Sequence, residues 1–442
     1  MSVALTQPFY QSSTFGWISI VRLGLVQAAI GAIVVMTTST LNRIMVVELA
    51  LPASLPGLLV AIHYFVQVIR PRMGFQSDSG AKRTPWIIGG VGLLALGGFG
   101  AAIATTLMGV NLIIGIAAAI VAFFFIGIGV SMSGTSLLAL LAKGVSDDRR
   151  AAAATTVWLM MIFGFALTSG LAGKFLDPYS PEKVILISGI ISSIACVLTV
   201  LALYKLEGHE LENKPISSEK KTPFRKALAD ILSDSDTKKF TIFIFLSMFA
   251  FSAQDLILEP FAGIVFKYSL GETTSLSGIQ HSGVLTGMLL VAVCGSSRLR
   301  PYFGSLRSWM IYGCFASALA MFGLVLAGIV EGPWPLKLNV FVLGLANGAF
   351  SIAAIASMMR LALVGGSGKE GVRIGLWGGA QAIAFGLGGL LGAGASDLAR
   401  GIFTNPAFAY SSVFFIEAIL FIASAYMASQ VESKTSSPSG AR

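Results

Sequence analysis

Twelve long apolar runs divide this chain, and they constrain its fold more than any other feature. Each is close to the ~20 residues that a helix needs to cross the ~30 Å hydrocarbon core of a bilayer. The runs lie near residues 20–41, 54–71, 86–107, 110–130, 151–173, 183–203, 240–260, 276–297, 309–330, 336–359, 372–395 and 409–428. With 55% hydrophobic and only 12% charged residues, the chain has more apolar side chain than a water-soluble core could bury. The sequence predicts an all-α, polytopic membrane protein with about twelve transmembrane helices.

The basic residues predict how these helices thread through the bilayer. Lys and Arg accumulate in cytoplasmic loops. If the N-terminus is cytoplasmic, only six of the 30 basic residues fall on the outer side, namely Arg43, Lys174, Lys183, Lys267, Lys337 and Arg400. Both termini are therefore predicted to be cytoplasmic. The net charge of +9 is explained by these loops, so no nucleic-acid partner is expected.

One hydrophilic stretch is long enough to separate two halves of the chain. It covers residues 204–239 and contains both acidic and basic residues. The predicted organisation is therefore a cytoplasmic segment, a six-helix bundle, a cytoplasmic linker, a second six-helix bundle and a cytoplasmic tail. Their respective limits are 1–19, 20–203, 204–239, 240–428 and 429–442.

Two residue patterns recur in both predicted halves. Gly127 precedes Lys143 by sixteen positions, and Gly344 precedes Arg360 by the same interval. Trp158 and Trp377 are each followed by glycines after twelve and fifteen positions. Two matches in the same order, displaced by about half the chain, indicate six-helix pseudo-repeats. This arrangement resembles that of the major facilitator superfamily, whose halves are parallel repeats.

The loop after the second predicted span strengthens this resemblance. Gly74, Asp78, Lys82 and Arg83 follow the order of the major facilitator signature, a glycine, an acid four residues later and then a basic pair. The position after the acid, usually an arginine, is Ser79 here, and the counterpart loop in the second half has no acid. Asp78 is predicted either to take part in gating or to fix the loop structurally.

A narrower resemblance covers nearly the whole chain. Three segments near the N-terminus carry it, and two more lie in the seventh and eleventh predicted spans; they are 22–27, 39–49, 52–55, 253–260 and 377–381. These segments resemble the PucC/LhaA family of light-harvesting complex assembly proteins. His63-Tyr64 and the run 70–74 resemble a branch of that family labelled bacteriochlorophyll synthase chain.

This resemblance implies an accessory protein of the bacterial inner, intracytoplasmic membrane. Its expected ligand is bacteriochlorophyll or a chlorin precursor, bound non-covalently, and a carotenoid is left open. Its expected partners, besides the lipid bilayer, are light-harvesting antenna polypeptides or bacteriochlorophyll biosynthetic enzymes. A homo-oligomer is also left open.

A chlorin needs an axial ligand for its magnesium, and two of the three histidines lie in predicted spans. His63 is in the second span and His281 is in the eighth, which is the pseudo-equivalent helix. Trp377 and Gln381 of the PucC-like segment complete the set of pigment-binding candidates. Each histidine has the alternative role of a hydrogen-bonded packing residue. Water or amide ligation is also open, through Gln27, Gln67, Gln280, Asn347 or Gln381. No other metal site is predicted.

A second candidate constellation consists of ionisable residues within the membrane, where they are costly and call for a partner. Arg43 and Glu48 lie at the outer end of the first span, and Asp255 and Glu259 at that of the seventh. Because these ends are pseudo-equivalent, Arg43 is predicted to pair with the carboxylates across the centre. The cluster is expected either to clasp the two halves or to serve proton-coupled transport. Glu417, within the last span, is expected to pair with another helix or to face a bound protein.

Three classes of function therefore compete. The accessory-protein class predicts lateral binding of pigment or of single-span antenna helices. The alternative is a secondary transporter of the major facilitator type for a small or amphipathic solute, such as a pigment precursor, and it predicts a polar central cavity. An enzyme is not expected. Prenyl-transfer enzymes hold a metal diphosphate with clustered acids, whereas the only adjacent acidic pair here, at 147–148, lies in a loop.

Overall fold

The computed structural model describes residues 15–67, 82–145, 149–207, 235–294, 304–330, 333–364 and 370–431. Within these ranges the regular structure is helical throughout, without a strand, which confirms the all-α prediction. The first half contains α1 (Trp17–Val35), η1 (Met36–Thr40), α2 (Leu41–Arg43), η2 (Ile44–Glu48), α3 (Ser54–Val66), α5 (Thr84–Met108), α6 (Leu112–Gly144), α7 (Arg150–Phe175) and α8 (Pro181–Leu203). The second contains α10 (Ser235–Val265), α11 (Leu270–Cys294), α13 (Leu306–Val330), α14 (Leu336–Val364), α15 (Glu370–Ile402) and α16 (Pro406–Gln430).

Eleven helices in the described ranges are long and apolar enough to cross a membrane. The apolar helix α3, with 13 residues, occupies the start of the predicted second span, and residues 68–71 of that span lie outside the described ranges. Large apolar side chains face outwards along the bundle, as at Leu96, Ile194, Phe315 and Ile416. A bilayer is the environment in which such a surface is stable. The protein is therefore a multi-pass membrane protein.

Some helices extend well beyond the predicted apolar runs. The helix α6 continues from the predicted end near 130 to Gly144. Its serines do not end it, because Ser131 and Ser133 donate to the carbonyl oxygens of Gly127 and Gly129 at 2.7 and 2.6 Å. Hydroxyls that bond four residues back in this way are accommodated inside a helix.

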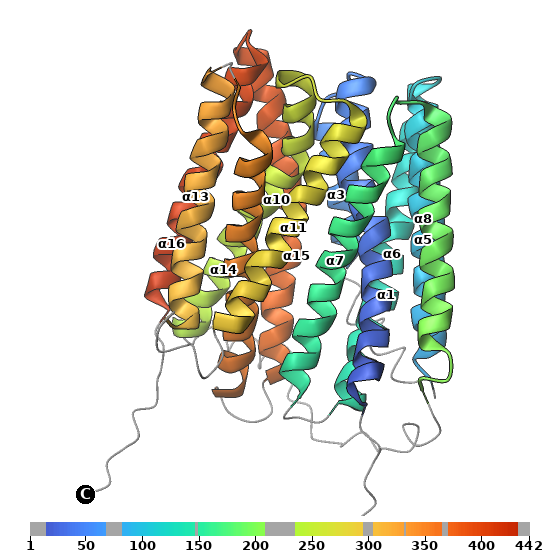
Figure 1. Ribbon diagram of the computed structural model, residues 1–442, viewed down its shortest axis with the longest axis vertical. Helices are drawn as coiled ribbons and strands as arrows, with labels where there is room; N and C mark the ends of the chain where they lie inside the picture. The colour runs from blue at the N-terminus through green and yellow to red at the C-terminus, as the bar shows by residue number, and fades with distance from the viewer. Residues whose placement is uncertain are drawn as a thin grey trace, which may run out of the picture.

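The same helix pairs are in contact in both halves. In the first half α1 packs on α7 and α8, α3 packs on α6, and α5 packs on α6 and α8. In the second half α10 packs on α15 and α16, α11 packs on α14, and α13 packs on α14 and α16. The halves meet where α7 contacts α11 and where α3 contacts α15, and Figure 1 shows α7 beside α11 near the middle of the bundle. This duplicated contact pattern is the two-repeat architecture predicted from the sequence.

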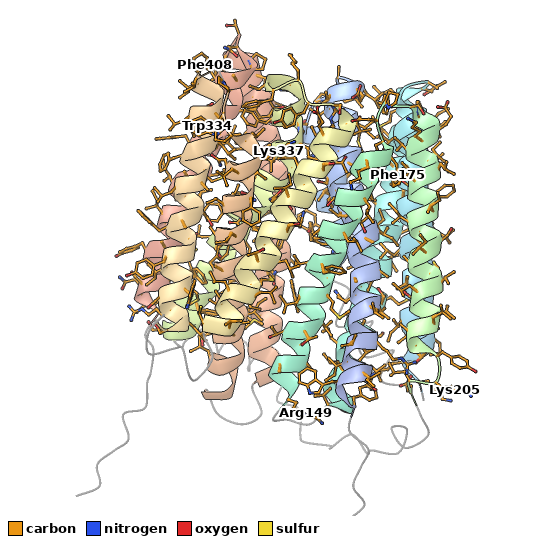
Figure 2. All side chains as sticks on the ribbon, viewed as in Figure 1. Arg149, Phe175, Lys205, Trp334, Lys337 and Phe408 are labelled. Atoms are coloured by element: carbon orange, nitrogen blue, oxygen red, sulfur yellow. The ribbon has the colours of Figure 1, made fainter. Side chains whose placement is uncertain are left out.

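Both described ends of the chain lie at one end of the bundle, where α1 begins and α16 ends (Figure 1). Figure 2 shows Arg149 and Lys205 at this same end and Lys337 in the opposite half of the bundle. This separation agrees with the predicted grouping of basic residues. We call the opposite end, where α3 and α11 begin, the predicted outer end, since its membrane side remains a prediction from loop charge.

Close approach of α11 and α14 depends on two glycine pairs spaced four residues apart. They are Gly283 and Gly287 on α11 and Gly344 and Gly348 on α14. A Cβ at Gly344 would lie 2.1 Å from the carbonyl oxygen of Gln280, and one at Gly287 would lie 2.0 Å from that of Leu345. Small residues drive helix association in lipid because they let backbones touch. These glycines hold α11, which carries several candidate residues, in place.

Candidate functional site

The outer half of the first membrane helix departs from regular α-helical hydrogen bonding. The π-helical segments η1 and η2 flank the single turn α2. Segments of this kind widen the helix and are frequent at functional sites. Between Thr37 and Arg43 nearly every side chain is buried, although the sequence there is mostly polar. Thr37 and Thr38 donate to the Val34 carbonyl oxygen of their own helix, whereas Ser39, Thr40 and Asn42 have partners on other helices.

Those partners lie on α10 and α11 of the second half. The Ser39 hydroxyl donates to the Glu259 carboxylate on α10 and is 3.0 Å from the Ser277 hydroxyl on α11. The Asn42 amide donates to the Leu256 carbonyl oxygen at 2.6 Å. We call this set, together with a Thr40–Thr274 hydroxyl contact of 3.4 Å, the central polar network. It joins the two halves through their first, seventh and eighth membrane helices.

Arg43 does not make the ion pair predicted from the sequence. Its guanidinium, 2% exposed, pairs with Glu48 on the same helix and donates to the Tyr268 carbonyl oxygen at 3.0 Å. Because π-helical turns alter the register after Arg43, Glu48 comes within reach five residues later. Burial, reinforced by the nearby Glu48 carboxylate, raises the pKa of Tyr179 in the α7–α8 loop above its ordinary value.

The two carboxylates of α10 have neutral partners. Asp255 accepts a hydrogen bond from the Gln280 amide at 3.0 Å, while Glu259 accepts the bond from Ser39 described above. His281 donates from Nδ1 to the Ser277 carbonyl oxygen at 2.8 Å. Its ring also meets that of Phe165 edge to face, with 5.0 Å between centroids. The carboxylates therefore belong to the contact between halves, with their hydrogen bonds made to uncharged groups.

A small cavity of about 40 Å³ lies beside this network. Its lining includes Thr38, Tyr64, Phe165, Asp255, His281 and Phe385, and therefore residues of both halves. This space could hold a few water molecules, whereas sites for small-molecule ligands usually measure ~300–1,000 Å³. Neither a sugar nor a chlorin fits the cavity in this conformation.

His63 is buried on α3, within the packing between membrane helices. Its Nε2 is 3.0 Å from the Gln67 amide nitrogen, and its ring meets that of Tyr64 edge to face at 4.7 Å between centroids. Gly127 of α6 approaches the His63 carbonyl oxygen, just as Gly344 of α14 approaches that of Gln280, the residue before His281. The repeated glycines thus hold the two histidine-bearing helices in equivalent ways.

Trp377 and Gln381 join α15 to α10. Trp377 is 1% exposed, its Nε1 donates to the Thr241 hydroxyl at 3.1 Å, and its ring lies 5.1 Å from that of Phe240. The Gln381 amide nitrogen is 3.9 Å from the sulfur of Met248. Both side chains are therefore engaged in helix packing.

A chlorin ligated by either histidine does not fit this geometry. Both imidazoles are at most 5% exposed and already make contacts with their own helices. The space beside His281 is far smaller than a macrocycle. Pigment would have to bind elsewhere or in another conformation.

The predicted loop motif is only partly within the described ranges. Gly74 and Asp78 lie outside them, so their predicted role is not addressed by this geometry. Lys82 is exposed. The backbone N–H groups of Arg83 and Thr84 donate to the Glu207 carboxylate at 2.8–2.9 Å, so this acid caps the N-terminus of α5.

Sequence reasoning missed two acidic residues that join the halves at the predicted outer end. Asp397, near the end of α15, accepts hydrogen bonds from the backbone N–H groups of Ala53 and Ser54 at 2.8 and 2.7 Å. Asp177, after α7, accepts one from the backbone N–H of Gly271 at 2.8 Å. Each carboxylate caps a helix of the opposite half, where the helix dipole favours negative charge. The internal repeat could have indicated them, because Asp397 follows Trp377 by 20 positions and Asp177 follows the equivalent Trp158 by 19.

Comparisons with known proteins agree with this architecture. A family model described as PUCC protein matches residues 40–436. The "Bacteriochlorophyll synthase 44.5 kDa chain" of Rhodobacter capsulatus is 50% identical over 418 residues, covering 95% of this chain and 96% of that protein. "Protein PucC" of the same organism is 28% identical, covering 91% and 90%.

Two solved structures of transporters share the fold. The nucleoside transporter NupG has a TM-score of 0.70 at 15% identity, with 94% of this chain and 100% of that chain covered. A D-xylose-proton symporter has a TM-score of 0.70 at 16% identity, with 95% and 98% covered. At such low identity the likeness concerns the fold alone.

Proposed function

This chain belongs to the PucC protein family, and from that premise we propose that it is a non-enzymatic membrane accessory protein that handles bacteriochlorophyll and assists the assembly of light-harvesting complexes. The observation that carries the proposal is the 50% identity, over 95% of the chain, to a protein named as a bacteriochlorophyll synthase chain. The proposed location is the bacterial inner membrane, with both termini cytoplasmic. The proposed partners are antenna polypeptides or bacteriochlorophyll biosynthetic enzymes.

The closed centre of the bundle favours handling at the lipid-facing surface. The cavity beside the central polar network is about 40 Å³, whereas large apolar side chains cover the outside of the bundle. Pigments and single-span antenna helices are both soluble in lipid and can reach that surface laterally. An accessory role without catalysis also accords with the sequence, whose only adjacent acidic pair, at 147–148, lies in a predicted loop.

The first test is to purify the protein in mild detergent from a bacteriochlorophyll-producing cell. We expect bacteriochlorophyll absorption in the purified sample and co-purification of antenna or biosynthetic polypeptides. An unrelated transporter of the same fold, purified from the same membranes, controls for pigment carried along by detergent. Absence of both pigment and partner would contradict the proposal.

A second prediction concerns the histidines. His63→Leu and His281→Leu should each leave the pigment content of the purified protein unchanged, because both imidazoles lie within helix packing and not beside a space of chlorin size. Absorbance per mole of protein measures the content, and size-exclusion chromatography checks that each variant is folded. Loss of pigment from a folded variant would assign its histidine to the binding site after all.

A transporter remains the second candidate, because one observation favours it. Glu259 belongs to the central polar network, and Asp255 and His281 line the cavity beside it, which has residues of both halves in its lining. Alternating access requires such a contact to open and close. Proton-dependent uptake of a solute into vesicles containing the purified protein, lost in Glu259→Gln, would support this candidate over the accessory role.

A further inference from the structure

Three polar side chains are buried inside the second half, away from the central polar network. They are Gln254 on α10, Asn347 on α14 and Glu417 on α16, with exposures of 0%, 0% and 2%. Glu417 therefore does not face a bound protein, which was one of its two predicted roles. All three lie near the middle of apolar helices, where a polar group without a partner is costly.

The helix register places Gln254 opposite Glu417. The Phe261 ring on α10 lies 5.7 Å from that of Tyr410 on α16, between centroids. These two helices run in opposite directions (Figure 1). Gln254 is seven residues before Phe261, and Glu417 is seven residues after Tyr410. Seven residues are about two helical turns, so both side chains return to the same seam at the same depth.

A second ring contact brings Asn347 to this level. Phe350 on α14 lies 5.9 Å from Phe421 on α16, between centroids, and these helices run in the same direction. Asn347 is three residues before Phe350, and Glu417 is four residues before Phe421, so both lie about one turn towards the predicted outer end. The Asn347 carbonyl oxygen already accepts from the Ser317 hydroxyl at 2.7 Å.

The remaining polar atoms of these three side chains form a complementary set. Both oxygens of Glu417, both amide atoms of Gln254 and the amide nitrogen of Asn347 have no hydrogen-bond partner within the described part of the chain. A carboxylic acid in its neutral form has one donor and one carbonyl acceptor. Such a group matches a primary amide, which offers an acceptor and a donor side by side.

The helices packed against α16 do not bring a positive charge to this level. These are α10, α13 and α15. On α10 the neighbouring titratable groups are Asp255 and Glu259, which are acidic. The nearest basic residue of this helix, Lys239, is fifteen residues from Gln254, about 22 Å along the helix. On α13 Arg307 donates to the Ser429 carbonyl oxygen near the end of α16. The other titratable side chains on these helices are uncharged groups or lie at the helix ends. At the predicted outer end of α15, Asp397 and Arg400 form an ion pair with each other.

From this geometry we infer that Glu417, Gln254 and Asn347 form an internal proton-binding site in the second six-helix bundle. The site takes its proton from water. The structure does not make these bonds, but in the proton-bound form the Glu417 O–H would donate to the Gln254 carbonyl oxygen, and the Glu417 carbonyl oxygen would accept from the Gln254 or Asn347 amide. Deprotonation would leave an ionised carboxylate without a cation, so the proton and the packing of α10 against α16 depend on each other. This inference does not rest on the proposed function.

Infrared spectroscopy of the purified full-length protein tests the site directly. A difference spectrum between the parent and Glu417→Gln at neutral pH should show the carbonyl stretch of a protonated carboxylic acid, which shifts in D₂O and is lost in the variant. Asp255→Asn is the control, and the Glu417 band should persist in it. A parent that lacks this band at neutral pH, compared with Glu417→Gln, would overturn the inference.

Two further measurements keep the test decisive. If Glu417→Gln does not fold, Gln254→Leu replaces it, and the acid band should then move to higher frequency because its hydrogen-bond acceptor is gone. An unmoved band would overturn the pairing. Thermal unfolding in sodium chloride against choline chloride tests for a metal cation, and stabilisation by sodium in the parent but not in Glu417→Gln would overturn the proton site in favour of a sodium site.

Discussion

Gly344→Ala should lower the stability of the protein by about 3 kcal/mol, at the upper end of the usual effect of overpacking. The added methyl carbon would lie 2.1 Å from the carbonyl oxygen of Gln280. That oxygen belongs to the backbone of α11, so a side-chain rotation cannot relieve the clash. The two helices would have to separate, and the contacts between Gly283, Gly287 and α14 would be lost with them. The temperature at which half of the protein remains monodisperse after heating in detergent measures the effect.

A matched substitution distinguishes this clash from the general effect of replacing glycine. At Gly394, in the helix α15 of the same half, an added Cβ meets nothing within 4 Å. Gly394→Ala should leave the protein unchanged or stabilise it by ~0.5–1 kcal/mol, because alanine loses less backbone freedom in a helix. Equal melting temperatures for Gly344→Ala and Gly394→Ala would contradict the close approach of α11 and α14.

The sequence marked Gly344 as part of a repeat but did not predict that it contacts α11. The interval shared by Gly127 and Gly344 predicted the two-fold repeat. In the structure Gly127 of α6 lies against α3, and Gly344 of α14 lies against the equivalent helix α11. Which carbonyl each glycine meets could not be predicted, since membrane helices are apolar all round and their hydropathy does not mark the buried face. Long apolar runs are therefore enough to predict spans and repeats, whereas helix rotation depends on contacts between distant segments.

The candidate site shows the same limit. The sequence marked four ionisable groups in apolar surroundings, namely Arg43, Glu48, Asp255 and Glu259. The structure buries Arg43 and Glu259 almost completely, whereas Asp255 is half-buried and Glu48 is exposed. Arg43 was predicted to pair across the centre because the outer ends of the first and seventh spans are pseudo-equivalent, whereas the π-helical turn brings Glu48 of the same helix within its reach. The network partner Ser39 was not predicted as a site residue, since the four consecutive hydroxyl side chains at 37–40 do not show by themselves which of them faces another helix.

Removing Asp177 and Asp397 together should open the predicted outer end of the bundle. Each carboxylate caps a helix of the opposite half, one joining α15 to α3 and the other joining the end of α7 to α11. The Asp177 carboxylate also accepts from the Ser269 hydroxyl. A lost cap costs about 1 kcal/mol. The double variant should therefore favour the open state by about 2 kcal/mol, a roughly 30-fold change in the ratio of open to closed protein.

Labelling of a single thiol can measure this opening. Thr274→Cys places the thiol on α11, where the parent side chain is 0% exposed and faces the central polar network. The native cysteines Cys196, Cys294 and Cys314 are replaced by alanine in all variants. A membrane-impermeant maleimide should label this cysteine slowly in the parent, faster in Asp177→Ala or Asp397→Ala, and fastest in the double variant.

The conservative variant decides whether the hydrogen bonds themselves hold the end closed. Asparagine at position 397 keeps one carbonyl oxygen for the two amides of Ala53 and Ser54, whereas alanine keeps none. Labelling in Asp397→Asn should therefore lie between that of the parent and that of Asp397→Ala. Because the two caps lie on different helix pairs, their costs add as free energies, so the factor by which labelling accelerates in the double variant should be the product of the factors in the single ones. Labelling of the double variant at the parent rate would show that the central polar network closes this end without the caps.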